Sequence, residues 1–191
     1  ERYSGTPEIV ERIVSTLPDW VPVSLVRGGM PRRIEHRVEE SCGARIQIVG
    51  PSRHLSPNAA RTVGMGGVHA QFVVFIDNGV VPAPGWLEHL LETARSRQAW
   101  VVRPIVLEDR AGHVVVHEVG GNCHLEERGN GVVLNETHDG QGRPFAELSL
   151  LKSEPVELFE FHAVMIDRAC LQSIGGMNDQ LLSQAEHLDV S

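Results

Sequence analysis

The chain has 191 residues, of which 41% are hydrophobic and 22% are charged, and its formal net charge is −8. This length and composition fit one globular domain with a sizeable core. The acidic balance argues against a duplex-DNA binder, and no apolar run reaches the ~18 residues of a membrane span. The three cysteines are widely spaced and form no C-x-x-C pair, so neither a disulfide framework nor a zinc knuckle is indicated. A reducing, cytoplasmic location is expected.

Residues 7–107 predict alternating helices and strands. Helices are expected at 7–17, 31–41, 56–66 and 85–97, and strands at 21–26, 45–50, 71–77 and 99–107. The first helix places Ile9, Ile13 and Leu17 on one face at intervals of four residues. Strand–helix–strand order, repeated three times, indicates right-handed crossovers. The strand segments at 45–49, 72–76 and 100–106 are therefore expected side by side in one mainly parallel sheet.

The pattern changes after residue 107. The stretches "GHVVVHEVGG" and "GVVLNE" are separated by Gly-rich turns, which predicts antiparallel hairpins. From about residue 155 the chain offers another strand, a short helix from Arg168 and a Gly-Gly stop. We predict one α/β domain over residues 1–191 with a hairpin insert at 108–150. Because the chain starts without a methionine and ends inside a motif, we expect it to be a segment of a longer protein.

The apolar stretch "QFVVFID" ends on Asp77, and a turn with two prolines follows it. Open α/β sheets bind ligands in the crevice beyond the carboxyl ends of their strands, so Asp77 is a candidate site residue. Asp, Asn and Gly also end strands because they tolerate tight turns. From the letters "IDNG" alone both interpretations stay open, and the turn is the more common one.

The order "SPNAARTVGMGGVHAQFVVFIDNGVVPAPGWLEHLLETA" resembles the centre of the inverting, GT-A-type family 2 glycosyltransferases. In that family an Ala-Arg-Asn helix precedes a strand that ends in Asp-x-Asp, and a Trp-Leu helix follows. The C-terminal "HAVMIDRACLQSIGGMNDQLLSQAEHLDVS" is similar to the family's Gly-Gly-Phe-Asp-Glu stretch and its later Glu-Asp-x-Asp motif. The resemblance implies an α/β, GT-A-like (Rossmann-like) fold, a mainly parallel sheet flanked by helices. It also implies transfer of a sugar from a nucleotide-sugar donor to a carbohydrate or other hydroxyl acceptor, with inversion.

The resemblance further implies a divalent cation, Mn²⁺ or Mg²⁺, at the donor site. Asp77 matches the first acid of Asp-x-Asp and is the expected metal ligand, whereas Gly79 replaces the second acid and Asn78 offers an amide oxygen. A hard cation takes oxygen ligands and neutralises the charge on the leaving diphosphate. Arg61 matches the arginine of the Ala-Arg-Asn helix and is expected near the nucleotide, with a surface ion pair as the alternative.

The stretch "AEHLDVS" contains the expected general base. Glu186 matches the family's Glu, His187 stands at the position of its Asp, and Asp189 matches the later Asp. An inverting reaction needs a carboxylate that takes the acceptor's proton as the acceptor oxygen attacks the anomeric carbon. We assign Glu186 or Asp189 to this role, with His187 as an alternative, and expect both acids near the crevice beyond Asp77.

Other features favour rival functions. The family's Val-Asp-Asp-Gly-Ser stretch is replaced by "VRGGM" at 26–30, which favours a non-catalytic domain that binds a sugar or a partner. The same glycines resemble, less closely, the phosphate loop of nucleotidyltransferases. His113, His117, Cys123 and His124 lie close in sequence, but their spacing matches no standard zinc pattern, so surface histidines are expected. Nucleic acid is not an expected partner.

Overall fold

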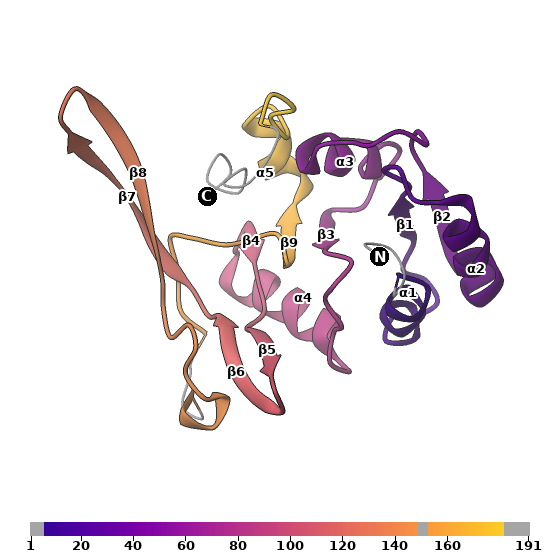
Figure 1. The fold of residues 1–191 in the computed structure, drawn as a ribbon, viewed down its shortest axis with the longest axis horizontal. Helices are drawn as coiled ribbons and strands as arrows, with labels where there is room; N and C mark the ends of the chain where they lie inside the picture. The colour runs from indigo at the N-terminus through magenta and orange to yellow at the C-terminus, as the bar shows by residue number, and fades with distance from the viewer. Residues whose placement is uncertain (1–5, 149–152, 182–191) are drawn as a thin grey trace.

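The computed structural model describes residues 6–148 and 153–181, and Figure 1 shows how its elements are arranged. The helices are α1 (Thr6–Ser15), α2 (Arg32–Cys42), α3 (Pro57–Gly64), α4 (Trp86–Arg97) and α5 (Arg168–Ser173), with short 3-10 turns at Gly43–Arg45 and Phe145–Leu148. The strands are β1 (Val23–Val26), β2 (Ile46–Val49), β3 (Phe72–Ile76), β4 (Val101–Val102), β5 (Val106–Arg110), β6 (His113–Glu118), β7 (Gly121–Arg128), β8 (Gly131–His138) and β9 (Ala163–Asp167). Within the described ranges these strands form four small sheets.

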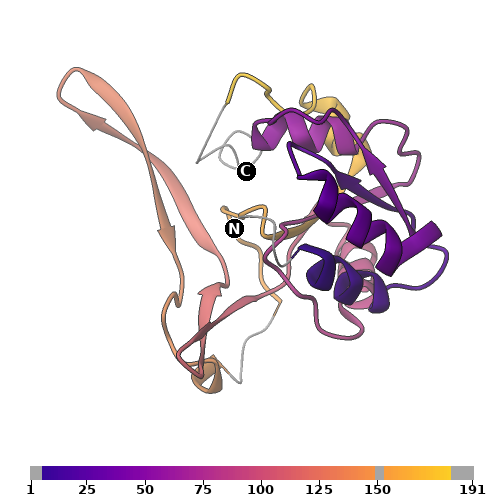
Figure 2. The same cartoon turned by 45° about the vertical axis from the view of Figure 1, so that its right-hand side comes forward.

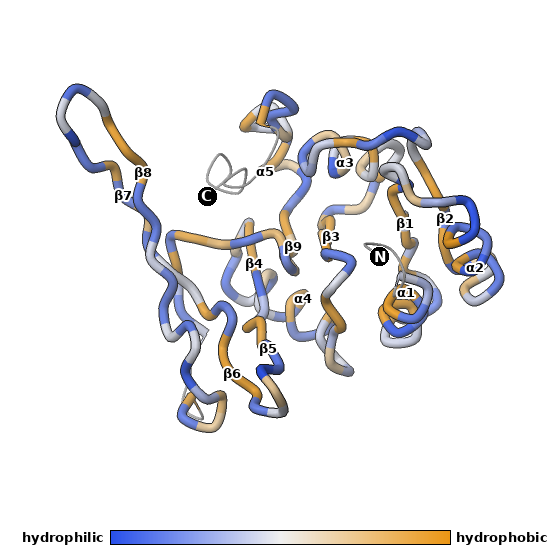
Figure 3. The backbone as a smooth tube through the Cα atoms, viewed as in Figure 1, coloured by the Kyte–Doolittle hydropathy of each residue, from blue (hydrophilic) through white to orange (hydrophobic). Residues whose placement is uncertain are grey.

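β1 and β2 form a parallel pair on which α1 and α2 pack. In Figure 3, hydrophobic colour runs along both strands. Apolar residues recur every four positions on each helix, so each helix has a continuous apolar stripe. The packed residues are Val10 and Val14 of α1, Val38 and Cys42 of α2, and Val23, Leu25, Ile46 and Ile48 of the strands. The buried stripe of α1 is therefore centred one position later than the predicted stripe of Ile9, Ile13 and Leu17.

The centre of the molecule is a three-stranded sheet in the order β3–β9–β4. Both outer strands run antiparallel to β9. Residues 163–166 of β9 are each 4% exposed or less. Side chains alternate between the two faces of the strand, so Met165 packs against α4, whereas Val164 and Ile166 pack on the opposite face with α5. β9 therefore separates two apolar cores and contributes to both.

The predicted GT-A-like, mainly parallel sheet is wrong. Segments 45–49, 72–76 and 100–106 are not neighbours, because β2 pairs with β1 while β9 lies between β3 and β4. In the described part of the chain the only parallel ladder is β1–β2, and the other sheets are antiparallel. The prediction failed because it paired strands that are consecutive in sequence. The apolar run 163–166, from much later in the chain, occupies the position between them.

Two antiparallel hairpins occupy the chain after Pro104. β4 has only 2 residues, and Pro104, which follows it, has no backbone N–H to donate to a strand ladder. The β5–β6 hairpin closes on Ala111 and Gly112, whose positive φ angles of 53° and 84° suit a two-residue turn. The longer β7–β8 hairpin pairs continuously from its base at Gly121 to its tip. Figures 1 and 2 both show this hairpin projecting from the rest of the molecule. The antiparallel hairpins expected after residue 107 are present.

Gly121, at the base of the β7–β8 hairpin, leaves no room for a side chain. A Cβ there would lie 2.0 Å from the carbonyl oxygen of Thr137 and 3.0 Å from Leu158. We predict that Gly121→Ala lowers the free energy of unfolding by about 1–3 kcal/mol, measured by urea denaturation, because the backbone must shift. Gly131→Ala, at the tip of the same hairpin, is the control, since a Cβ there meets nothing within 4 Å. The control should change the free energy by less than about 0.5 kcal/mol, and equal effects of the two substitutions would contradict this prediction.

Candidate functional site

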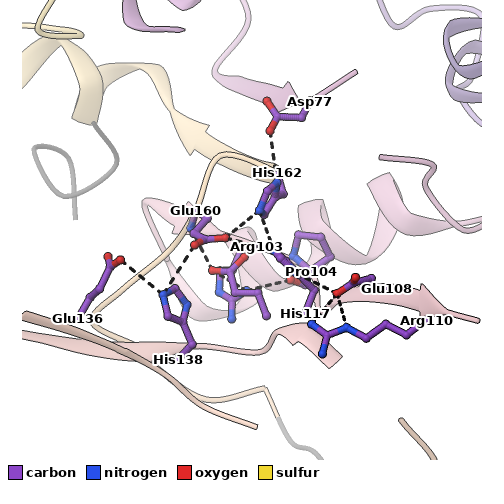
Figure 4. A network of polar contacts seen from close by, with 11 residues as sticks. Asp77, Arg103, Pro104, Glu108, Arg110, His117, Glu136, His138, Glu160 and His162 are labelled. Atoms are coloured by element: carbon purple, nitrogen blue, oxygen red, sulfur yellow. Dashed lines mark hydrogen bonds and ion pairs between the residues drawn. The ribbon is translucent and has the colours of Figure 1, made fainter. Parts of the chain in front are cut away.

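The antiparallel register of β3 and β9 places Asp77 beside His162. Ile76 lies opposite Ala163, and one step further the Asp77 backbone N–H donates to the His162 carbonyl at 3.0 Å. His162 Nδ1 also lies 3.3 Å from Asp77 Oδ2, as Figure 4 shows. The acid expected from the strand-end pattern therefore has an imidazole partner from a distant part of the sequence.

The second ring nitrogen of His162 lies in a cluster of three side chains. His162 Nε2 is 2.8 Å from Glu160 Oε2 and 2.9 Å from His117 Nε2. Glu160 and His162 precede β9, whereas His117 comes from β6. The two imidazole rings meet edge-on, with their centroids 4.7 Å apart. We call His117, Glu160 and His162 the histidine–glutamate cluster.

Each histidine of the cluster has a carboxylate near its other ring nitrogen. His162 Nδ1 faces Asp77, and His117 Nδ1 lies 3.6 Å from Glu108 Oε2 of the neighbouring strand β5. Arg110 lies 2.9 Å from the same Glu108 oxygen. Its hydrogen bond is the main reason that the pKa of Glu108 is below the ordinary value. Carboxylate partners of this kind fix the orientation of an imidazole ring and decide which nitrogen carries the proton.

A buried ion pair connects the cluster to β6. The side chains of Arg103 and Glu118 are only 6% and 2% exposed, and Arg103 Nη1 lies 3.1 Å from Glu118 Oε1. Burial raises the pKa of Glu118 and lowers that of Arg103. Glu118 Oε1 also accepts a hydrogen bond from the Glu160 backbone N–H at 3.0 Å. Because Glu118 and His117 belong to the same strand, this hydrogen bond holds Glu160 near His117. Loss of either charge of the ion pair would leave the other buried and unpaired.

β8 contributes an outer histidine to the same region. His138 Nε2 lies 3.8 Å from Glu160 Oε1 and 3.7 Å from Glu136 Oε1. Its Nδ1 is buried and has no hydrogen-bond partner among the described residues. Side chains from β5, β6, β8 and the segment before β9 therefore converge around Glu160 (Figure 4).

The acids around His162 favour its charged form. Hydrogen bonds to Asp77 and Glu160 raise the pKa of His162 from 6.5 to about 10. The reciprocal effect, led by the hydrogen bond from His162, lowers the pKa of Glu160 from 4.5 to about 2. General acid–base catalysis at neutral pH needs a group whose pKa lies near the working pH. The pair of Glu160 and His162 is therefore an ion pair that suits positioning better than proton transfer, and a metal ion can bind His162 only by displacing a proton.

The histidine–glutamate cluster has the ligand atoms of a metal site. Its three residues each offer one nitrogen or oxygen, and these atoms all lie within 4.8 Å of one another. Imidazole nitrogen and carboxylate oxygen suit zinc and related ions. The residue expected from the sequence to bind a metal, Asp77, lies at the edge of this cluster and not in a pair of aspartates.

Of the residues predicted for the donor site, Asp77 alone belongs to this region directly. Asn78 is exposed in the turn after β3. Arg61 of α3 lies over the Phe161 ring, 3.7 Å from its centroid. Arg61 also donates to Asn58 Oδ1 at 3.0 Å, so its contacts include α3 itself and the Phe161 ring.

The predicted bases Glu186 and Asp189, and the alternative His187, lie outside the described residues. The structure does describe the turn that precedes them. Thr62 of α3 donates to Asp179 Oδ1 at 3.0 Å. The Gly-Gly-Met-Asn-Asp turn is thus attached to α3, the helix predicted to lie near the nucleotide.

Of the histidines expected at the surface, His113 and His124 are exposed, whereas His117 is partly exposed and lies against His162. Glu160 and His162 are not among the site residues predicted from the sequence. Their one signal is the order Glu-Phe-His directly before an apolar strand. A search for site residues at the ends of strands overlooks this signal, because the two residues stand before a strand. In an antiparallel pair, the beginning of one strand lies beside the end of the other.

Comparison of the chain with models of known protein families and with curated protein sequences gave no match. The family resemblance therefore rests on the motifs. Among the helices of residues 6–148 and 153–181, none combines the length and apolar character that crossing a membrane requires. Two surface hollows, of ≈ 260 and ≈ 370 Å³, are lined by other residues, one beside Trp100 and one beside Arg27 and Glu35.

The ion pair of His162 makes stability depend on pH. Its pKa of about 10 in the folded chain exceeds the ordinary 6.5. The charged ring therefore stabilises the fold fully below about pH 6.5, and this contribution is lost as the pH rises to about 10. In metal-free solution we predict that His162→Gln costs roughly 2 kcal/mol of unfolding free energy near pH 6, allowing for partial exposure of the pair, and much less near pH 10.

Urea denaturation at a series of pH values measures this difference. The exposed His113 supplies the control, and His113→Gln should show no comparable change with pH. A penalty for His162→Gln that stays constant from about pH 6 to about pH 10 would refute the ion-pair account.

Proposed function

We propose that the chain transfers a sugar from a nucleotide-sugar donor to an acceptor hydroxyl, with inversion at the anomeric carbon. The motif resemblance suggests this reaction, and one observation supports it best. The Asp77 side chain is 50% exposed, while His162 lies 3.3 Å from one of its oxygens. One carboxylate oxygen is thus positioned by the imidazole, while the side chain remains accessible from solvent and can bind a cation. The proposal concerns these residues and not a GT-A fold, which the sheet order contradicts.

In this proposal the diphosphate of the donor lies at the carboxyl end of β3. Asp77 would hold Mn²⁺ or Mg²⁺, with Asn78 beside it as an uncharged oxygen ligand, and the cation would supply positive charge to offset that of the diphosphate. Arg61 adds positive charge nearby, since its guanidinium lies over Phe161. The acceptor is a carbohydrate or another compound with a free hydroxyl.

The transfer is a single displacement. The acceptor oxygen bonds to the anomeric carbon as the bond from that carbon to the diphosphate oxygen breaks. The hydroxyl proton passes to Glu186 or Asp189, and the nucleoside diphosphate leaves. We place the reaction in the cytoplasm, because Cys42, Cys123 and Cys170 are free thiols.

A non-catalytic domain that binds a sugar or a partner is the second candidate. Gly79 in place of the second acid favours it, as does "VRGGM" in place of Val-Asp-Asp-Gly-Ser. Arg27 of this stretch lies 2.6 Å from Glu35 and donates to the Gly50 carbonyl at 2.7 Å, a structural role that needs no nucleotide. The two candidates differ in turnover, whereas both allow sugar binding.

Restoring the second acid tests the donor site. A Cβ at Gly79 meets nothing within 4 Å, so a side chain fits there. We predict that Gly79→Asp strengthens Mn²⁺-dependent binding of a nucleotide sugar by about tenfold, because a second carboxylate joins Asp77. Asp77→Asn should abolish that binding. Isothermal titration with uridine, guanosine and thymidine diphosphate sugars, with and without Mn²⁺, measures both effects.

Gly79→Asn is the matched control, since it adds a side chain of the same size without charge. Equal gains from Gly79→Asn and Gly79→Asp would show that charge is not responsible. If neither the unaltered chain nor Gly79→Asp binds any nucleotide sugar, the proposed donor site is wrong.

The base assignment has a separate test. In a chain that carries out the transfer, replacing the true base by its amide should lower turnover by ~10² to 10⁴ and leave donor affinity nearly unchanged. Initial rates and donor titrations for Glu186→Gln and Asp189→Asn measure the two quantities. Full activity in both variants would remove the assignment and leave His187 or a residue after Ser191 as the base.

A further inference from the structure

We propose that His117, Glu160 and His162 bind a divalent first-row transition-metal ion, and that zinc fits them best. Its ligands differ from Asp77, which takes Mn²⁺ or Mg²⁺ in the proposed reaction and here only orients His162, and the proposal does not depend on that reaction. Three features carry the proposal: the spacing of the ligand atoms, the carboxylates behind both imidazoles, and the buried contacts that hold the ligands together.

The ligand atoms already have nearly the spacing that one ion requires. His162 Nε2 lies 2.9 Å from His117 Nε2 and 2.8 Å from Glu160 Oε2, and His117 Nε2 lies 3.7 Å from that oxygen. In a tetrahedral zinc site with bonds of about 2.1 Å, ligand atoms are about 3.4 Å apart. Side-chain movements of about half an ångström therefore admit an ion, and the backbone can stay in place.

Both imidazoles present the nitrogen that a metal needs. Nε2 of each ring points into the cluster, while Nδ1 faces a carboxylate, Asp77 for His162 at 3.3 Å and Glu108 for His117 at 3.6 Å. Metal-binding histidines typically donate their other N–H to a carboxylate, which orients the ring and strengthens it as a ligand. Here two such rings face each other. One proton lies between their Nε2 atoms, which are 2.9 Å apart, and a metal ion that binds there displaces this proton and uses both lone pairs.

The surroundings hold the ligands in place and select the ion. Glu118, in its buried pair with Arg103, accepts the backbone N–H of Glu160 and so attaches this ligand to β6, the strand that carries His117. Two nitrogens and one carboxylate oxygen favour zinc, cobalt or nickel over magnesium and calcium. The three side chains are 20% to 32% exposed, which gives an ion a path from solvent. Three protein ligands leave the fourth tetrahedral position to water.

Zinc binding by the full, untagged chain tests the proposal. After dialysis against a chelator, titration with Zn²⁺ in the absence of nucleotide sugar should give one site per chain with a dissociation constant of about 1 µM or below. Co²⁺ in place of Zn²⁺ should give the visible absorption of a tetrahedral nitrogen and oxygen site. Millimolar Mg²⁺ should not compete with Zn²⁺.

Variants identify the ligands. His117→Ala and His162→Ala should each weaken Zn²⁺ binding by about 100-fold or more, whereas His113→Ala, an exposed position on the same strand, should bind as the unaltered chain does. Asp77→Asn and Glu108→Gln remove the carboxylates behind the rings and should weaken binding by about 10- to 100-fold. Circular dichroism checks that each variant folds. If a ligand variant does not fold, the Co²⁺ spectrum of the unaltered chain still reports on the ligands.

Absence of Zn²⁺ binding up to about 100 µM would overturn the proposal and leave the cluster as a hydrogen-bonded network. Binding that survives both His117→Ala and His162→Ala would overturn it as well. Because no nucleotide sugar is present, neither result bears on sugar transfer. Zinc binding without donor binding would instead keep this site and remove the proposed function.

Discussion

The position of β9 between β3 and β4 is the constraint on which the rest of the structure depends. Its residues 164–166 contribute to the core under α4 and to the core that contains the T-shaped rings of Phe159 and Phe161, whose centroids are 5.6 Å apart. The sheet closes only after the chain has passed through both hairpins. Its formation therefore requires contacts between residues far apart in sequence, which carry a larger cost in chain entropy than local pairs do.

The same strand pairing determines the candidate site. Antiparallel neighbours bring the end of one strand to the beginning of the next, so Asp77 and His162 meet at one edge of the sheet. The buried contact between Glu118 and the backbone of Glu160 then adds β6 and its His117. Burying the charges of Arg103 and Glu118 is unfavourable, and only the pairing of the two charges offsets that cost. The geometry of the site and the stability of the central sheet are thus coupled.

Much of the local structure can be predicted from the sequence, whereas the pairing of strands cannot. Apolar spacing and Gly-rich turns locate the helices before residue 107 and the hairpins after it, because these elements depend on neighbours a few residues away. Sheet order depends on which apolar segments meet across long connections, and the rule that pairs consecutive strands does not anticipate β9. For the same reason Asp77 is identifiable as a strand end, but its partner His162 is not. Glu160 and His162 lie in the segment where the sequence predicts a strand from about residue 155, whereas the strand begins only at Ala163.

The β7–β8 hairpin has a consequence for how the protein behaves at high concentration. In the described part of the chain it pairs with no other strand. The backbone N–H groups of Glu157 and Leu158 donate to Gly121 at its base, and beyond that base both of its edges are open. On one face, Leu125, Val132 and Leu134 are 72%, 62% and 39% exposed. An open strand edge beside apolar side chains is a template on which another chain can add a strand, and charges such as those of Glu126 and Glu127 oppose this. High protein concentration therefore favours association of chains through this hairpin.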